Sequence, residues 1–268
     1  MRKPFVALFA PPGVNPERDR MADMTAASSP RFSDATLAFL RALRRHNDRE
    51  WFRARKGTYE QHVRAPMVAL VERLAADLPR FAPEIVASVK VSLYRPYRDT
   101  RFSEDKRPLK THASAVFPCR GLAKHEGAGL YFEVNCDHVL VAGGLYAPQT
   151  PQLQRLREHL AANHVQFRAL VESPAFRRAF GRIEGQALRR VPRGFPADHP
   201  AAEYLRQRQF LAGREYPAPF CTSPRFYSTL VRLFEILAPV VRFLNEPLLA
   251  TTRPTDPLTV SSPPAAGV

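Results

Sequence analysis

Three arginines that recur at every third position form the pattern in this sequence that is best suited to bind an anion. Arg95, Arg98 and Arg101 stand in a polar stretch that ends at His112. A guanidinium group can hold a phosphate or a carboxylate with two parallel hydrogen bonds, and this spacing lets a helical turn or a tight loop point several of them one way. We therefore predict that the stretch binds an anionic, phosphate-bearing ligand, with nucleic acid as one option.

The predicted binding set extends beyond the arginines. Lys106 and Lys110 would add point charges, and Asp99 could orient one guanidinium group. His112 could donate a hydrogen bond or transfer a proton near neutral pH, where an ordinary imidazole titrates. The predicted ligand-binding residues are Arg95, Arg98, Asp99, Arg101, Lys106, Lys110 and His112.

Two other hypotheses explain the same residues, and the sequence leaves all three open. In one, the protein is an enzyme that acts on an anionic small molecule, with Asp99 or His112 as the acid or base. In the other, Asp99 and the acidic residues that follow it pair with the nearby cations. The stretch would then be an internal salt-bridge staple in a structural or protein-interaction domain.

The charge of the whole chain agrees with an anionic partner. The 268 residues carry 40 Lys and Arg against 25 Asp and Glu, a formal net charge of +15. A field of this sign attracts phosphates and nucleic acids, although a basic composition can also serve solubility alone. No apolar run approaches the about 20 residues that cross a bilayer, so we expect no membrane partner and a cytoplasmic location.

The cysteines and the known motifs exclude several classes of protein. Cys119, Cys136 and Cys221 are far apart and odd in number, which argues against a disulfide framework and against a structural zinc site. The sequence has no phosphate-binding P-loop, no dinucleotide fingerprint and no nucleophile elbow. We therefore expect no metal and no cofactor, and the oligomeric state is left open.

Strand-like alternation in the middle of the chain predicts the element that positions the stretch. Val89–Leu93, His112–Pro118, Gly129–Asn135 and Val139–Tyr146 alternate apolar and polar residues, and a short link at 136–138 suggests a hairpin. In Gly129–Asn135 the alternation predicts one face made of Leu130, Phe132 and Val134, and another made of Tyr131, Glu133 and Asn135.

Helical spacing of apolar residues surrounds these strands on both sides. A helix is expected from Ser33, a second with Asn47 as part of its cap, and a third with Pro66 in its first turn. Further helices are expected at 153–171, from Ser173, around 201–210 and after Ser223.

The order of these elements predicts an α+β fold. The fold class is a single domain with an antiparallel sheet of about four to five strands flanked by helices. The domain is expected to span residues 31–247, between a disordered N-terminal extension (1–30) and a flexible C-terminal tail (248–268) rich in Pro, Ala, Ser and Thr.

The stretch also carries a resemblance to a known family. Residues 95–112 read R-x-x-R-D-x-R-F-x-x-D-K-x-P-x-K-T-H, which resembles the signature of a bacterial family, domain of unknown function 2461. Leu109 stands where that pattern has a tyrosine. The resemblance covers about residues 31–247 and implies no established activity. The further matching pieces are Asn47–Phe52 with Lys56 and Tyr59, Gly143–Pro148, and Pro192–Pro200.

Overall fold

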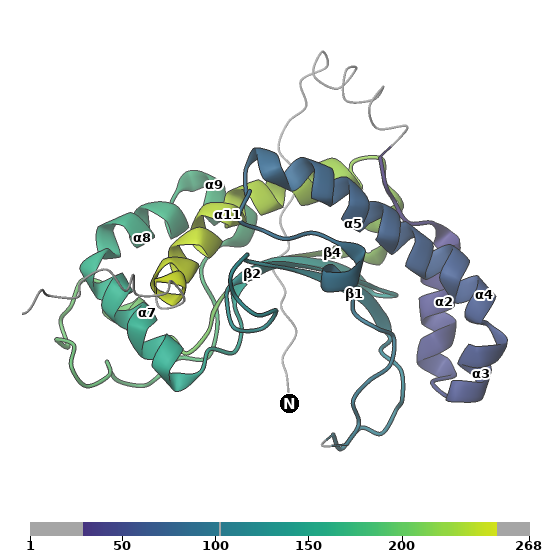
Figure 1. Cartoon of the computed structure of the whole chain (residues 1–268), viewed down its shortest axis with the longest axis horizontal. Coiled ribbons are helices and arrows are strands. Elements are labelled where there is room, and N and C mark those ends of the chain that lie inside the picture. The colour runs from purple at the N-terminus through teal and green to yellow at the C-terminus, as the bar shows by residue number, and fades with distance from the viewer. Residues whose placement is uncertain (1–28, 102, 251–268) are drawn as a thin grey trace, which may run out of the picture.

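The computed structural model describes residues 29–101 and 103–250 (Figure 1). Nearly all of the predicted N-terminal extension and of the predicted C-terminal tail lies outside these ranges. The helices before the sheet are α2 (Asp34–Arg45), α3 (Arg49–Ala54), α4 (Lys56–Tyr59), the π-helix η1 (Glu60–Arg64), α5 (Ala65–Asp77), the 3-10 helix η2 (Leu78–Arg80) and α6 (Val89–Ser92). The later helices are α7 (Thr150–Ala162), α8 (His164–Val171), α9 (Pro174–Phe180), α10 (Ala202–Leu205), the 3-10 helix η3 (Ala218–Thr222) and α11 (Phe226–Leu249).

One antiparallel sheet of four strands lies at the centre, which confirms the predicted α+β class. Its strands are β1 (His112–Pro118), β2 (Gly129–Asn135), β3 (His138–Leu145) and β4 (Phe210–Pro217), and they neighbour each other in that order. The hairpin between β2 and β3 falls where the short link predicted it. The connection from β3 to β4 is long because it contains α7 to α10.

Helices cover one face of this sheet. Figure 1 shows α5 and α11 lying over it, and α11 contacts both β2 and β3. Leu130, Phe132 and Val134 of β2 are fully buried on this side. Phe132 packs against the rings of Phe32 and Phe226, with centroids 5.9 and 5.5 Å away. This covered face is therefore the apolar side that the alternation predicted.

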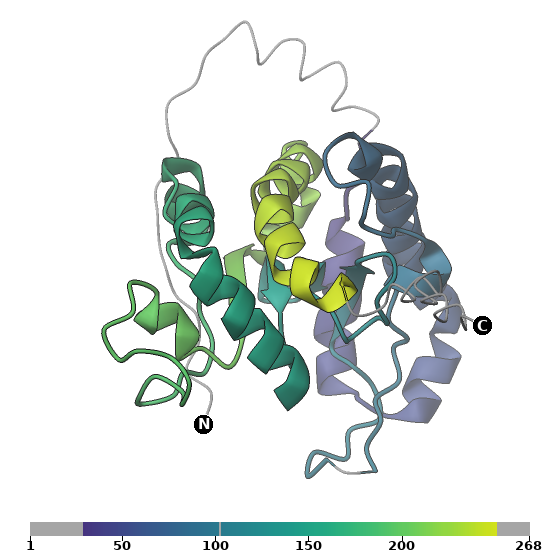
Figure 2. The ribbon, with the colours of Figure 1, turned by 60° about the vertical axis from the view of Figure 1, so that its left-hand side comes forward.

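The opposite face, called the open face here, carries the polar residues of the same strands. Tyr131, Glu133 and Asn135 are half-buried there. The segment between α6 and β1 extends away from this side of the sheet (Figure 1), and Figure 2 shows the same segment from another direction. The polar side chains of the open face and of this segment are therefore not covered by the helices that pack on the other side of the sheet.

The predicted strand at Val89–Leu93 is wrong. Residues 89–92 form the single-turn helix α6, and the Ser88 hydroxyl caps it by accepting the Val91 N–H at 3.2 Å. Only Leu93 pairs with the sheet, through one bridge to Ala115 of β1. A local cap and tertiary contacts have overridden the preference of valine for strands.

The fourth strand was not predicted because its sequence lacks regular alternation of apolar and polar residues. β4 reads F-L-A-G-R-E-Y-P, in which the buried Phe210 and Ala212 are followed by a glycine and charged residues. The helix expected around 201–210 is the four-residue α10 and ends at Leu205. Pairing with β3 along its whole length, rather than its own alternation, makes this segment a strand.

The cap of the second helix is also different from the prediction. Asp48, and not Asn47, caps α3 by accepting the Trp51 N–H at 2.7 Å. Asn47 is thereby left to bind the backbone of Leu109, whose N–H and carbonyl lie 3.0 and 2.9 Å from its side chain. Two pieces of the family resemblance, far apart in the sequence, therefore meet at this contact.

Candidate functional site

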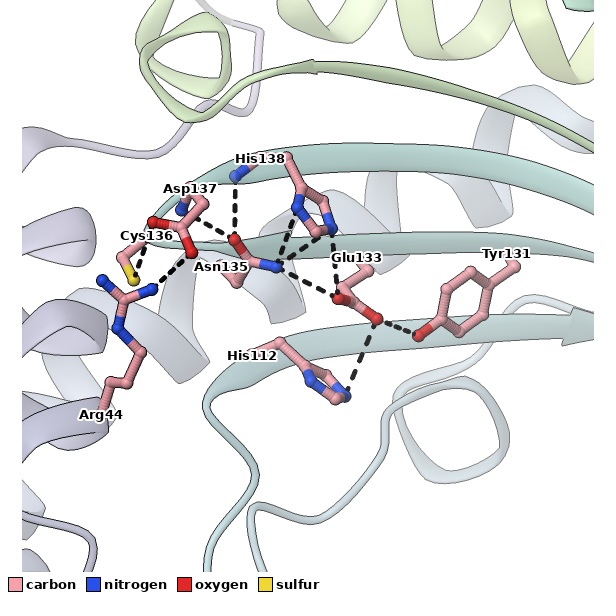
Figure 3. A network of polar contacts seen from close by, with 8 residues as sticks. All are labelled: Arg44, His112, Tyr131, Glu133, Asn135, Cys136, Asp137 and His138. Atoms are coloured by element: carbon pink, nitrogen blue, oxygen red, sulfur yellow. Dashed lines mark hydrogen bonds and ion pairs between the residues drawn. The ribbon is translucent and has the colours of Figure 1, made fainter. Parts of the chain in front are cut away.

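Glu133 lies in the middle of the open face (Figure 3). The register places it between Ser114 of β1 and Leu140 of β3. Its carboxylate accepts hydrogen bonds from the Tyr131 hydroxyl at 2.6 Å and from the Asn135 amide at 3.4 Å. Burial acts to raise the pKa of Glu133, but these bonds and the neighbouring histidines lower it overall. Glu133 is therefore an anion at neutral pH.

Two histidines flank this carboxylate, one from each neighbouring strand. His112 Nε2 is 3.8 Å from Glu133 Oε2, and His138 Nε2 is 3.7 Å from Oε1. Their pKa values shift in opposite directions: burial lowers that of His112, whereas the Glu133 carboxylate raises that of His138. Paired groups whose environments separate their pKa values are suited to act as a base and an acid.

The β2–β3 hairpin holds the edge of this cluster in place. Asn135 Oδ1 accepts the backbone N–H groups of Asp137 and His138, at 2.7 and 2.8 Å. Asp137 forms an ion pair with Arg44 of α2, and Cys136 Sγ lies 3.7 Å from its Oδ1 (Figure 3). These contacts order the loop that carries His138.

The segment at 95–111 is a narrow pair of antiparallel arms, called the protruding segment here. The Arg98 N–H donates to the Pro108 carbonyl at 2.9 Å, and the Lys110 N–H donates to the Pro96 carbonyl at 2.7 Å. One bridge joins Tyr97 to Leu109, whose side chain is buried. At Leu109, where the family pattern has a tyrosine, this chain therefore buries an apolar side chain.

Carboxylates inside the protruding segment pair with most of its arginines. Arg98 and Arg107 both donate to Asp105 Oδ2, at 2.6 and 2.7 Å. Hydrogen bonds from Arg107 and then from Arg98 hold the pKa of Asp105 well below its usual range. The ion pairs that the structural hypothesis requires are present.

Asp99 is paired in the same way. It accepts from Arg101 at 2.7 and 3.0 Å, and these bonds lower its pKa to about 2. A carboxylate with so low a pKa has little basicity at neutral pH, which weighs against Asp99 as a catalytic base. Lys106 Nζ donates to the Thr100 carbonyl at 3.1 Å.

Lys110 lies between the protruding segment and the open face. Its ammonium group is 4.4 Å from the centroid of the Tyr94 ring, and Lys124 is 4.3 Å from the same ring. Burial lowers the pKa of Lys110, and the charge of Glu133 partly offsets this shift. Of the predicted site residues, Lys110 and His112 are thus the two that meet the Glu133 cluster.

A cavity of about 340 Å³ lies at the base of the protruding segment. Helices α3 to α6, residues 93–97 and the start of β1 form its walls. Four of its lining residues are basic and one is acidic, namely Lys56, Arg64, Lys90, Arg95 and Glu60. Arg64 pairs with Glu60 at 3.5 Å. In the described part of the chain, no carboxylate pairs with Lys56, Lys90 or Arg95.

Local structure explains how these cations come to face one space. The π-helix η1 supplies Glu60 and Arg64, and such segments re-aim side chains and recur at functional sites. The helical turn of α6 carries Lys90 to the same wall. Arg95 follows directly after Leu93 and Tyr94, which are tied to β1 through the bridge to Ala115 and a 3.1 Å hydrogen bond.

The structure therefore separates the predicted binding residues into three groups. Arg98, Asp99 and Arg101 are engaged within the protruding segment, as is Lys106. Lys110 and His112 lie beside Glu133. Arg95 lines the cavity.

Most of the residues that line the cavity were not predicted from the sequence. Lys56 and Tyr59 were noted only as pieces of the family resemblance, and Lys90 was placed on a strand that does not form. The family resemblance could have indicated Lys56 and Tyr59. Two separate stretches, Asn47–Tyr59 and residues 95–112, match the same family, and this suggests that they contribute to one site. Across residues 29–101 and 103–250, no three His, Cys, Asp or Glu side chains gather as metal ligands.

Comparison with known families gives one clear result. The model of a family of conserved hypothetical proteins, DUF2461, matches residues 35–243, so the chain belongs to that family. The resemblance of the sequence to this family is thereby confirmed. No curated protein matches the chain. None of the helices within 29–101 and 103–250 combines the length and apolar character needed to span a membrane.

Proposed function

We propose that this protein binds an anionic, phosphate-bearing ligand in the cavity at the base of the protruding segment. One observation carries the proposal: Lys56, Lys90 and Arg95 line a single concave space without carboxylate partners in the described ranges. Cations held together cost electrostatic repulsion, which a bound phosphate would relieve. The guanidinium group of Arg95 can contact two phosphate oxygens, while the two ammonium groups act as point charges.

The proposed site contains Arg95 from the predicted Arg95–Lys110 stretch, together with Lys56 and Lys90 from the helices. Arg98 and Arg101 already donate to carboxylates, so binding there would compete with existing ion pairs. Arg95 requires no such exchange. The relevant part of the stretch is therefore its first arginine.

Calorimetric titration with inorganic phosphate tests the proposal. The wild-type protein is expected to bind phosphate, with an affinity that falls as salt is raised because the contacts are ionic. Arg95→Ala is expected to weaken binding by about 10-fold or more, since hydrogen bonds to charged groups contribute about 1.5–3 kcal/mol. A wild-type protein that takes up no phosphate at low salt would refute the proposal.

Arg189→Ala is the matched control for Arg95→Ala. Arg189 is exposed, carries the same charge and does not line the cavity. It is expected to leave the phosphate affinity nearly unchanged. An equal loss in both variants would show that the net charge of the chain, and not the cavity, holds the anion.

An enzyme that acts on an anionic small molecule is the second candidate. The observation in its favour is the Glu133 cluster, in which His112 and His138 have pKa values displaced in opposite directions. Each histidine side chain is about one-third exposed, at 31% and 33%, so a substrate can reach both. In this version His112 is the base, His138 is the acid and Glu133 positions them.

Incubation with a panel of phosphate monoesters, followed by NMR, tests this second candidate. Turnover that disappears in His112→Gln and keeps its rate in Arg189→Ala would support it. Absence of turnover with every member of the panel, or turnover that His112→Gln does not slow, would count against it. Phosphate binding in the calorimeter is a separate readout and does not depend on this outcome.

A further inference from the structure

We propose that the ligand of the cavity is a small nucleotide, with its phosphate on the cations and its base on the ring of Tyr97. This inference rests on the proposed function, because it assigns a ligand class to the same site. It depends on a further observation, that aromatic rings and unpaired cations line the same space. The rings in the cavity wall are those of Phe52, Tyr59, Tyr94 and Tyr97.

Tyr97 is the ring that is free to stack. It is 52% exposed and is one of only three large hydrophobic residues with high exposure in the described ranges. The ring of Phe52 meets it at 74°, with centroids 5.9 Å apart, so this contact uses an edge and not both faces. Base stacking on such a ring suits any nucleobase, because every base has a π-face.

Tyr94 is not available in the same way. Lys110 and Lys124 lie 4.4 and 4.3 Å from its ring centroid, and the His125 ring stacks on it at 6.0 Å. Its role is therefore to hold two cations near the site. The different surroundings of the two tyrosines assign the base to Tyr97.

Tyr59 supplies a polar group for the middle of the ligand. Its hydroxyl has no hydrogen-bond partner among residues 29–101 and 103–250, although its ring packs against Phe39 and Phe52. Burial, and then the charge of Glu60, raises the pKa of Tyr59 to about 12, so the hydroxyl stays a donor at neutral pH. A donor in the same wall as the cations and the exposed ring suits a sugar that links a phosphate to a base.

The size of the site favours a single nucleotide over a strand. Helices α3 to α6, residues 93–97 and β1 line a space of about 340 Å³. Small-ligand sites are concave spaces of this order, whereas sites for single strands are grooves that follow the backbone. The ligand class is therefore a nucleoside monophosphate.

Calorimetry with a series of related probes tests the inference on the full chain. The probes are inorganic phosphate, ribose 5-phosphate, AMP and a short oligothymidylate. AMP is expected to bind about 5- to 150-fold more tightly than ribose 5-phosphate, the range that stacking of one base provides. Equal affinities for AMP and ribose 5-phosphate would overturn the inference, and so would an oligothymidylate that binds more tightly than AMP.

Variants of the exposed tyrosines separate stacking from charge. Tyr97→Leu is expected to remove the advantage of AMP while leaving the affinity for inorganic phosphate within about twofold, because no cation is changed. Tyr97→Phe keeps the ring and should retain the advantage. Tyr146→Leu is the matched control, because Tyr146 is 61% exposed and lies outside the cavity.

The two proposals fail in different ways. If phosphate does not bind, the proposed function fails. If phosphate binds and depends on Arg95, but AMP gains nothing over ribose 5-phosphate, only the nucleotide assignment fails. An AMP advantage that survives Tyr97→Leu would also overturn the assignment, because the base would then lie elsewhere.

Discussion

The two faces of the sheet are built from alternate residues of the same strands, and they differ in burial and in polarity. On the covered face of β2, Leu130, Phe132 and Val134 are fully buried under helices. On the open face, Tyr131 and Glu133 are half-buried and bind each other. The covered face stabilises the fold through apolar burial, and the open face carries titratable groups that are partly exposed to solvent.

This difference separates residues that stabilise from residues that are free to act. A side chain on the covered face loses many contacts when it is shortened, because interiors are densely packed. A side chain on the open face loses fewer contacts, and its charge and hydrogen bonds matter more. We therefore expect substitutions to lower the free energy of unfolding most on the covered face. The loss should be moderate and pH-dependent on the open face, and small in the protruding segment.

A matched pair of leucines tests the comparison with the largest expected effect. Leu130→Ala, on the covered face, is expected to lower the free energy of unfolding by about 2–5 kcal/mol, through lost burial and a cavity. Leu140→Ala, on the open face and only half-buried, is expected to cost about 1 kcal/mol or less. Urea denaturation measures both. Equal losses would show that the open face is packed in solution.

Removal of the charge at the centre of the open face should have a moderate effect that depends on pH. The raised pKa of His138 means that its pairing with Glu133 stabilises the fold fully below the unfolded-state value, and that this contribution is lost as pH rises through the folded-state value. Glu133 stays ionised under mildly acidic conditions because its own pKa is lowered. Glu133→Gln should therefore cost about 2 kcal/mol at about pH 5.5 and less at about pH 8.

Urea denaturation at the two pH values measures this effect, and NMR titration should show a lower pKa of His138 in the variant. Glu158→Gln, an exposed change on α7, is the control and should show no such dependence. A loss from Glu133→Gln that is equal at both pH values, or larger at the higher one, would contradict the assigned pairing.

The smallest effect is expected in the protruding segment. Arg101→Ala should leave the denaturation midpoint unchanged within error, because the pair with Asp99 is exposed and solvent screens it. The same change should raise the pKa of Asp99 from about 2 towards that of an ordinary aspartate, since Arg101 is the cause of the lowered value. NMR titration of the carboxylate measures this shift. A clear loss of stability would favour the structural hypothesis for the segment.

Alternation and helical spacing were enough to predict much of the fold. His112–Pro118 and Gly129–Asn135 are strands with the predicted bounds, and Ser173 caps the helix that follows it by accepting the Phe176 N–H. These predictions succeeded because each rests on contacts between near neighbours. The prediction missed β4 because pairing with β3 decided its structure, and it was wrong for Val89–Leu93 because the cap at Ser88 and tertiary contacts overrode the preference of valine for strands.

The charged stretch shows the same limit at the candidate site. The sequence indicated that residues 95–112 carry many cations, but not which of them are matched by carboxylates. Asp105 takes both Arg98 and Arg107, which only the course of the two antiparallel arms determines. Arg95 differs from the other arginines of the stretch because it lines the cavity together with residues of α3 to α6.

Residue patterns alone predicted the family and the α+β class. They also predicted the two faces of the sheet, because side chains on a strand point alternately to opposite sides. The three-dimensional fold was needed to show that Lys56, Lys90 and Arg95 share one cavity and that His112 and His138 flank Glu133. These residues come from helices and strands whose distance along the chain does not specify their distance in space. Packing of the helices against the edge of β1, and the antiparallel register of β1 to β3, bring them together.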